Sequence, residues 1–207
     1  MQISLIDPGL APSGEQLRLP DGDMVFYPRF LAPAEADALF QVLLTETPWQ
    51  QDYLNFGGRQ VTIPRLQAWY GDKQSNYGYS GLALKPLAWT QTLASVRDSI
   101  RMATRQDFNS VLLNYYRSGM DSVSWHSDNE KELGADPSIA SLSLGITRRF
   151  ELKHKRRKDI PKTTCELGHG SLLVMGAGMQ KHWHHQVPKQ PEVTGARINL
   201  TFRFIVS

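Results

Sequence analysis

The sequence predicts a mainly β protein of the α+β class, in which flanking helices pack on a jelly-roll core. Two segments carry apolar residues at helical spacing, and most of the remaining chain consists of short strand-like runs. Clusters of Gly, Pro and Asp separate these runs, which favours an antiparallel barrel or sandwich over a sheet of alternating parallel strands.

Length and composition set the broad class of protein. We expect the 207 residues to form a single domain, 1–207, because such a chain can bury a core without disulfides. The single cysteine, Cys165, excludes an internal disulfide and a zinc cluster of thiolates. Asp7, Pro8 and Gly9 stand where the apolar core of a signal peptide would lie, and no apolar run is long enough to cross a membrane. We expect a soluble monomer in the cytoplasm, or in the nucleus of a eukaryote.

The elements follow from composition and periodicity. Residues 1–23 are rich in Pro, Gly and Asp, so we expect an N-terminal arm without regular structure. Helices are expected from Pro33 to Leu44 and from about Pro86 to Thr104, since apolar positions share one face and proline is tolerated in a first turn. Strands are expected at Arg65–Tyr70, Val111–Tyr116, Ser138–Ile146, Arg149–Lys155, Ser171–Met175, His182–Val187 and Arg197–Val206. The jelly-roll core would span about 108–207.

The segment Trp125-His126-Ser127-Asp128 contains the first candidate metal ligands. In an extended chain, residues two apart share a face, so His126 and Asp128 would point to one place. The run from Lys181 to Pro188 adds three histidines, which alternate in direction and cannot all bind one ion; spacing does not choose among them. Two imidazoles and a carboxylate suit ferrous iron with open coordination positions. A surface loop and a surface histidine cluster are the alternative interpretations.

The C-terminal strand alternates polar and apolar residues. Its polar face contains Arg197, Asn199, Thr201 and Arg203. A half-exposed amphipathic strand would show the same alternation, but arginines at both ends suit the two carboxylates of a small diacid, because a guanidinium binds a carboxylate bidentately. Asn114 and Tyr116 also share a face of their strand and could complete such a pocket.

These motifs resemble those of the AlkB-type iron(II) and 2-oxoglutarate-dependent nucleic-acid demethylases over about residues 30–206. The resemblance rests on Asn114-Tyr115-Tyr116, His126-Ser127-Asp128, His185 before Pro188, and Arg-x-Asn-x-Thr-x-Arg at 197–203. It implies a double-stranded β-helix, with iron(II) bound by His126, Asp128 and His185. It also implies 2-oxoglutarate held by Asn114, Tyr116, Arg197, Asn199, Thr201 and Arg203, with Arg203 counted among the catalytic residues.

The resemblance further implies a substrate-recognition lid at about residues 50–85. Tyr77 and Tyr79 share a face of this lid, and Tyr79 would stack on an extracted base with the His126 ring on its other side. Phe56, beside Gly57 and Gly58 at a hairpin tip, would wedge into a duplex. These aromatics would otherwise close a loop or fold back onto the core. Asn129 and Glu130 follow the iron motif where they could contact the base; relatives often have Asp at the first of these positions, which leaves base preference open.

A basic block begins at Arg148 and Arg149 and continues through Lys162. Such a block attracts nucleic acid, although it is also typical of a solvated hairpin loop. The implied activity is direct repair of DNA: N-methyl groups of 1-methyladenine and 3-methylcytosine are oxidised with O2 and 2-oxoglutarate, releasing formaldehyde, succinate and CO2. The alternatives are an oxygenase acting on RNA or on a protein side chain, and a nucleic-acid-binding module with a vestigial metal pocket.

Overall fold

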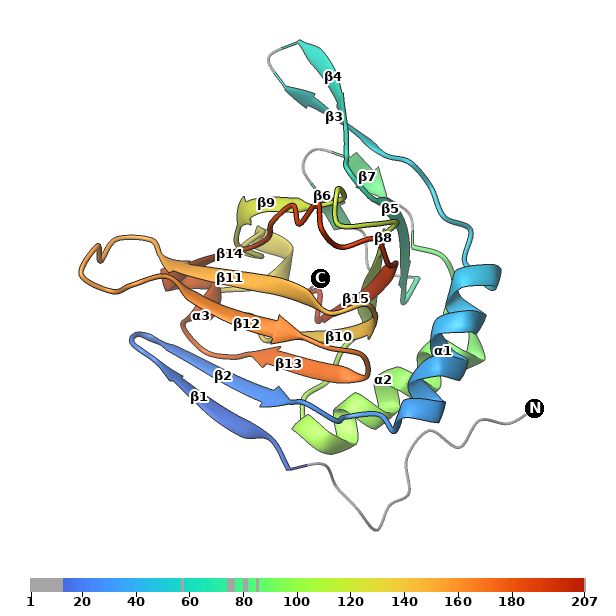
Figure 1. Cartoon of the computed structure of the whole chain (residues 1–207), viewed down its shortest axis with the longest axis horizontal. Helices are drawn as coiled ribbons and strands as arrows, with labels where there is room; N and C mark the ends of the chain where they lie inside the picture. Colours follow the sequence, from blue (N-terminus) through green and yellow to red (C-terminus); the bar gives the residue numbers. More distant parts are fainter. Residues whose placement is uncertain (1–12, 57, 74–76, 80–81, 85, 207) are drawn as a thin grey trace.

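The structure, a computed structural model, describes residues 13–56, 58–73, 77–79, 82–84 and 86–206; for residues 54–56, 77–79 and 82–84 it describes the backbone alone. Two β-sheets and two longer helices dominate it (Figure 1). No helix in these ranges is both long and apolar enough to span a membrane.

The two sheets are antiparallel throughout. The larger sheet has the order β1 (Glu15–Leu19), β2 (Gly22–Tyr27), β13 (Ser171–Met175), β10 (Ile139–Gly145), β15 (Arg197–Arg203), β8 (Ser110–Tyr116) and β5 (Leu66–Gly71). The smaller sheet has the order β12 (Thr163–Leu167), β11 (Arg148–His154), β14 (Trp183–Val187) and β9 (Val123–His126). This pair of sheets is the jelly roll that the sequence predicts.

Two apolar clusters hold the layers together. One joins the outer face of the larger sheet to α1 (Pro33–Glu46) and α2 (Gln91–Thr104), with Leu39, Ile100 and Leu200 fully buried (Figure 1). The other lies between the sheets and includes Leu112 of β8 and Leu152 of β11. Burying one such side chain contributes about 1.5–3 kcal/mol. The first cluster therefore stabilises the packing of the helices on the larger sheet, and the second stabilises the packing of the two sheets on each other.

The first helix agrees with the sequence and the second begins later than expected. Pro33 occupies the first turn of α1, and the Glu35 carboxylate accepts from the Ala32 N–H at 3.0 Å. The expected start of the second helix at Pro86 is wrong: Leu87 pairs with β5, donating to the Trp69 carbonyl at 2.8 Å. The helix starts after Thr90, whose hydroxyl caps it by accepting from the Leu93 N–H at 3.1 Å.

The described part of the N-terminal segment is not the irregular arm that its composition suggests. Residues 15–27 form the hairpin β1–β2, and β2 pairs with β13 at the end of the larger sheet. The hairpin turns at Asp21, which has a φ of 59°, a left-handed conformation that aspartate tolerates. The Pro20 carbonyl accepts from the Trp183 indole at 2.9 Å, so the turn is tied to the smaller sheet.

The remaining strands lie close to their expected ranges, and β12 and the short β9 are additional. A short helix, α3 (Met179–His182), replaces the expected start of a strand at His182, and a 3-10 helix, η1 (Lys131–Leu133), follows β9. Two hairpins, β3 (Tyr53–Phe56) with β4 (Arg59–Thr62) and β6 (Tyr77–Tyr79) with β7 (Leu82–Leu84), complete the chain. The hairpin β3–β4 projects from the body of the molecule (Figure 1).

Candidate functional site

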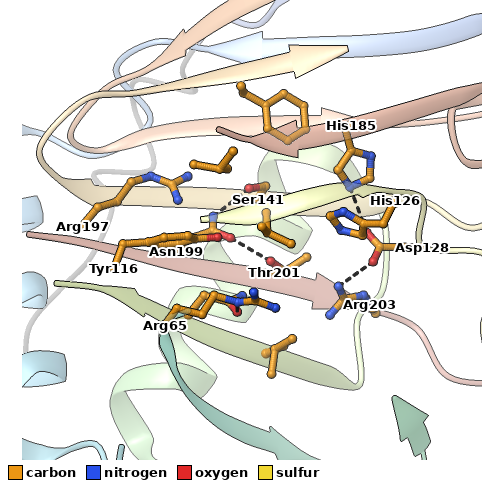
Figure 2. Close-up of a pocket in the computed structure, with 15 residues that line it drawn as sticks. Arg65, Tyr116, His126, Asp128, Ser141, His185, Arg197, Asn199, Thr201 and Arg203 are labelled. Carbon is orange, nitrogen blue, oxygen red and sulfur yellow. Dashed lines mark hydrogen bonds and ion pairs between the residues drawn. The ribbon is translucent and has the colours of Figure 1, made fainter. Parts of the chain in front are cut away.

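A narrow pocket, with a cavity volume of about 40 Å³, opens between the two sheets. Its lining combines polar side chains from β8, β15 and β10 of the larger sheet with others from the smaller sheet. The polar and charged members are Arg65, Asn114, Tyr116, His126, Asp128, Ser141, His185, Arg197, Asn199, Thr201 and Arg203. Figure 2 shows that these side chains converge on one space from separate strands.

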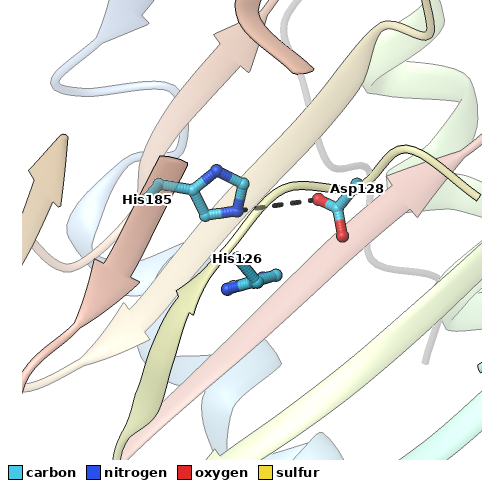
Figure 3. A group of neighbouring side chains, drawn as sticks. All are labelled: His126, Asp128 and His185. Atoms are coloured by element: carbon cyan, nitrogen blue, oxygen red, sulfur yellow. Dashed lines mark ion pairs between the residues drawn. The ribbon is translucent and has the colours of Figure 1, made fainter. Parts of the chain in front are cut away.

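Three of these residues form a group that can hold a metal ion. One ligand atom from each of His126, Asp128 and His185 lies within 4.8 Å of the others (Figure 3). His126 ends β9 and pairs in register with His185 of β14, so the two rings are adjacent, with centroids 4.3 Å apart. Asp128 lies in the loop beyond β9, where its N–H donates to Oε1 of Gln180 at 2.9 Å. The side chains of His126 and Asp128 therefore point to one place as expected, although β9 ends at His126 and Asp128 lies beyond it.

The protonation states in this group suit metal binding. Burial and the neighbouring His126 lower the pKa of His185 to about 3, so its ring is neutral near pH 7 with a lone pair available. Burial alone would raise the pKa of Asp128, but Arg203, His126 and His185 outweigh it and hold that pKa well below its usual range. The Nδ1 atom of His126 lies 2.8 Å from the Ser124 carbonyl; donation there leaves Nε2 unprotonated.

The opposite end of the pocket contains a buried arginine with unused donors. Arg197 is 1% exposed, and its Nη2 donates to Ser143 Oγ at 3.0 Å. Its Nε and Nη1 atoms are buried without a hydrogen-bond partner among the residues that the structure describes. The guanidinium carbon lies 5.1 Å from the centre of the Tyr116 ring. Burial lowers the pKa of Arg197. Because no described carboxylate lies at ion-pair distance from its guanidinium, a carboxylate entering the pocket would become its counterion.

The polar residues between the two ends are held in fixed orientations. The Asn199 amide donates to Ser141 Oγ at 2.8 Å and to the Leu142 carbonyl at 3.0 Å, while its oxygen accepts from Thr201 at 2.9 Å. Both amide hydrogens of Asn199 are thus directed at the protein. Ile198, Leu200 and Phe202 on the other face of β15 are fully buried, which excludes a half-exposed amphipathic strand.

Arg203 lies beside the candidate metal ligands. Its Nη2 donates to Asp128 Oδ1 at 2.8 Å, and both side chains are buried. The two arginines of β15 are therefore at opposite ends of the pocket, as Figure 2 shows. One is engaged with the candidate metal ligands, and the other is distant from them.

Several residues at the site were not anticipated from the sequence. They are Arg65, Gln67, Ser141, Ser143 and Gln180, all of which are buried and contact a candidate site residue. Alternation in the strand Ile139–Gly145 places Ser141 and Ser143 on one face, a signal that could have found them. No comparable pattern marks Arg65 or Gln180.

The predicted substrate contacts stay predictions. Gly57 and the side chains of Phe56, Tyr77 and Tyr79 lie outside what the structure describes, whereas Gly58 has a φ of +78° with open space around it. Asn129 is exposed, and Glu130 is partly buried directly before η1.

Arg148, the first residue of the basic block, does not contribute to the surface charge. Arg148 is fully buried, and its guanidinium donates to Gln190 Oε1 and to backbone carbonyls, among them Pro188 at 2.7 Å. It therefore joins two loops of the protein and cannot attract a polyanion. Lys162 is exposed and Lys153 is partly buried, and their ammonium groups lie 5.6 and 4.3 Å from the centre of the Trp125 ring.

Comparisons with known proteins agree with the fold and with the candidate metal site. The model of the 2OG-Fe(II) oxygenase superfamily matches residues 23–203. The chain is 39% identical over 191 residues to bovine DNA oxidative demethylase ALKBH2, covering 87% of this chain and 68% of the relative. It is 40% identical over 190 residues to mouse alpha-ketoglutarate-dependent dioxygenase alkB homolog 3, covering 86% and 65%. The solved structure of OsALKBH1 covers 92% of this chain and all of its own, with a TM-score of 0.60 and 19% identity, a likeness of fold.

Proposed function

Because this chain belongs to the 2OG-Fe(II) oxygenase superfamily, we propose that it removes methyl groups oxidatively from N-alkylated bases of DNA, 1-methyladenine and 3-methylcytosine above all. Its cofactors are Fe(II) and 2-oxoglutarate. When bound, they supply the oxidation of the methyl group by O2, which releases formaldehyde, succinate and CO2. The relatives named as DNA oxidative demethylases, which match most of the chain, support a DNA substrate.

The donor set fits the iron. His126, Asp128 and His185 would hold it, because two neutral imidazoles and one ionised carboxylate leave coordination positions free for cosubstrate and O2. Arg203 keeps the Asp128 carboxylate charged and oriented through its 2.8 Å hydrogen bond. Iron is therefore expected to bind without a large rearrangement of these side chains.

The other end of the pocket fits the cosubstrate. The observation that supports it best is the buried Arg197, whose Nε and Nη1 have no partner among the described residues while Tyr116 lies against the same guanidinium. Arg197 would bind the distal carboxylate of 2-oxoglutarate, and Asn114 would donate to the molecule between the two ends. Asn199 and Thr201 would hold the floor of the pocket, since their hydrogen bonds are made within the protein.

Base recognition would come from the predicted lid at about residues 50–85. Tyr79 would stack on the extracted base opposite the His126 ring, with Tyr77 on the same face of the lid, and Phe56 with Gly57 and Gly58 would form the wedge. Because 1-methyladenine and 3-methylcytosine are cationic near neutral pH, Glu130 would favour them electrostatically, with Asn129 beside it. We propose a monomer that works in the cytoplasm, or in the nucleus of a eukaryote, on methylated DNA.

Formaldehyde release tests this function. The purified protein with Fe(II), ascorbate and 2-oxoglutarate is given oligonucleotides containing one 1-methyladenine or 3-methylcytosine, as single-stranded DNA, duplex DNA and RNA. Formaldehyde and succinate are expected in equal amounts from a DNA substrate. The Asp128→Ala variant is the matched control and should release neither. Turnover on RNA alone would assign the RNA alternative, and no turnover on any nucleic acid would contradict the proposal.

A further inference from the structure

A third arginine, Arg65, lines the pocket and is not among the residues proposed to bind iron or 2-oxoglutarate. It lies between the hairpin β3–β4 and the start of β5, and it is 5% exposed. Its Nη1 donates to the Ser122 carbonyl at 3.2 Å, just before β9. In Figure 2 its side chain approaches the polar residues on the pocket floor, away from the metal ligands. Arg65 thus places a buried positive charge beside the residues proposed to bind 2-oxoglutarate.

Arg65 fixes the orientation of the Asn114 side chain. Its Nε donates to Asn114 Oδ1 at 2.7 Å, and Gln67 Nε2 donates to the same oxygen at 2.9 Å. An asparagine amide can sit in two orientations, but two donors that converge on one atom require it to be the oxygen. Asn114 lines the pocket. Its NH2 group is therefore left to donate toward the pocket.

The charge of Arg65 is not neutralised by a close partner. No carboxylate within the described part of the chain lies at ion-pair distance from it. Arg65 does act at longer range on Asp52: burial raises the pKa of that carboxyl, and the arginine opposes the rise. A buried guanidinium without a close counterion is costly, and an anion bound in the pocket would offset that cost. Three arginines and one carboxylate line the pocket, a field that favours an anionic occupant.

We propose that Arg65 is a positioning residue for the cosubstrate: by holding Asn114 Oδ1, it aims the Asn114 amide at 2-oxoglutarate and so sets the affinity for that molecule. The inference rests on the proposed function. Gln67 has the same role without the charge, since it donates to the same atom. The two donors come from one edge of the sheet, Arg65 from just before β5 and Gln67 from within it.

The test is a double-mutant cycle read by binding. The dissociation constant of 2-oxoglutarate is measured by calorimetry on Mn²⁺-loaded protein, for wild type, Arg65→Gln, Asn114→Ala and the double variant. Arg65→Gln is expected to weaken binding about 10-fold, the size of a lost charge-assisted hydrogen bond. In the Asn114→Ala background the same change should weaken it less than about 2-fold, because residues that act through each other are not additive.

Further variants separate orientation from charge and from misfolding. Gln67→Leu keeps the charge and removes the neutral donor, so it should weaken 2-oxoglutarate about 3-fold, within the range of one neutral hydrogen bond. It also keeps the proposal testable should Arg65→Gln not fold. Arg149→Gln removes an exposed arginine outside the pocket and should leave the affinity unchanged. Mn²⁺ affinity should be the same in all variants, and the dissociation constant of a methylated oligonucleotide should be the same in the variants of Arg65, Gln67 and Asn114.

The outcomes are distinct. Unchanged 2-oxoglutarate affinity in Arg65→Gln or in Gln67→Leu, fully additive losses in the cycle, or a loss confined to oligonucleotide binding would each overturn the positioning role. If wild-type protein itself fails to bind 2-oxoglutarate, it is the proposed function that fails. The two failures are therefore distinguishable in one set of titrations.

Discussion

The two arginines of β15 occupy matching positions at opposite ends of one pocket, yet their surroundings differ. Arg203 donates to the Asp128 carboxylate at 2.8 Å, so its end of the pocket contains a close pair of opposite charges. Arg197 donates to the hydroxyl of Ser143 at 3.0 Å and lies against Tyr116, and no described carboxylate is at ion-pair distance from it. The difference indicates that the charge of Arg203 is balanced by a carboxylate of the protein, whereas no described carboxylate pairs with Arg197 and one from outside would balance its charge.

Removing the carboxylate at the Arg203 end should have the largest effect. Asp128→Ala deletes a proposed iron ligand and leaves Arg203 buried without its ion-pair partner. We expect turnover to fall by at least about 1000-fold, and the free energy of unfolding of the metal-free protein to fall by about 3 kcal/mol, as for a broken buried pair. Formaldehyde assays and urea denaturation measure the two quantities. An unchanged rate of demethylation would refute the assigned iron site.

Removing the charged side chain at the Arg197 end should not destabilise the protein. Arg197→Met removes a buried charge that has no counterion among the described residues, so the metal-free protein should be as stable as wild type or more stable. Affinity for 2-oxoglutarate should fall about 100-fold, since a buried charge-assisted pair is lost. Thermal denaturation and calorimetry check this pair of results. A variant that is destabilised as strongly as Asp128→Ala would show that the two ends do not differ as described.

Acid should destabilise the metal end. The pKa of His185 is lowered to about 3 in the folded protein by burial and by His126, against about 6.5 when unfolded. The unfolded state therefore binds more protons between these values, and stability falls as pH drops from about 6.5 toward 3. The folded pKa of Asp128 is also lowered, whereas its unfolded pKa is near 4. Asp128 therefore adds a further loss of stability as the pH falls below about 4. Urea midpoints of metal-free protein at several pH values should show this fall.

His185→Gln provides the control for the pH effect. It removes the titrating group at the centre of β14 while keeping a polar side chain, so the fall in the urea midpoint between pH 6.5 and 4 should become shallower. Equal slopes in wild type and variant would assign the acid sensitivity to other groups.

The smallest effect is expected from the one hydroxyl that contacts Arg197. Ser143→Ala removes the acceptor at 3.0 Å without changing charge, so the guanidinium would lose part of its orientation. Affinity for 2-oxoglutarate should fall about 3-fold, within the range of one hydrogen bond, while Mn²⁺ affinity stays constant. A loss of Mn²⁺ affinity with unchanged 2-oxoglutarate affinity would contradict the assignment of Ser143 to the Arg197 end of the pocket.

Much of this two-ended site could be predicted, because its members belong to a regular strand. Alternation along Arg197–Arg203 identified the polar face, and in the structure Arg197 pairs with Tyr116 and Asn199 with Asn114 across β15 and β8. The pair His126 and Asp128 was also found from spacing. The choice of His185 among three histidines needed the family resemblance, and its central position in β14 supports that choice.

Other features could not be predicted, because their causes are tertiary. Arg65 and Gln67 are two residues apart in an expected strand, but the role of Arg65 arises from contacts with Asn114 and Ser122, which are distant in sequence. Arg148 resembles any charged residue of a basic run until the loops that bury it are known. The turn of the hairpin β1–β2 has a recognisable signal in Pro20-Asp21-Gly22, but the pairing of β2 with β13 joins segments far apart in the sequence and no local pattern predicts it.

The most direct test of the two-ended pocket is the ratio of the affinities for 2-oxoglutarate and 2-oxobutyrate, measured on Mn²⁺-loaded protein. The two molecules share the oxo acid group, and only the first has a distal carboxylate. Wild type should prefer 2-oxoglutarate by about 100-fold, the value of one buried charge-assisted pair, and Arg197→Met should bind both about equally. A preference that survives in Arg197→Met would contradict the assignment of that end to the distal carboxylate.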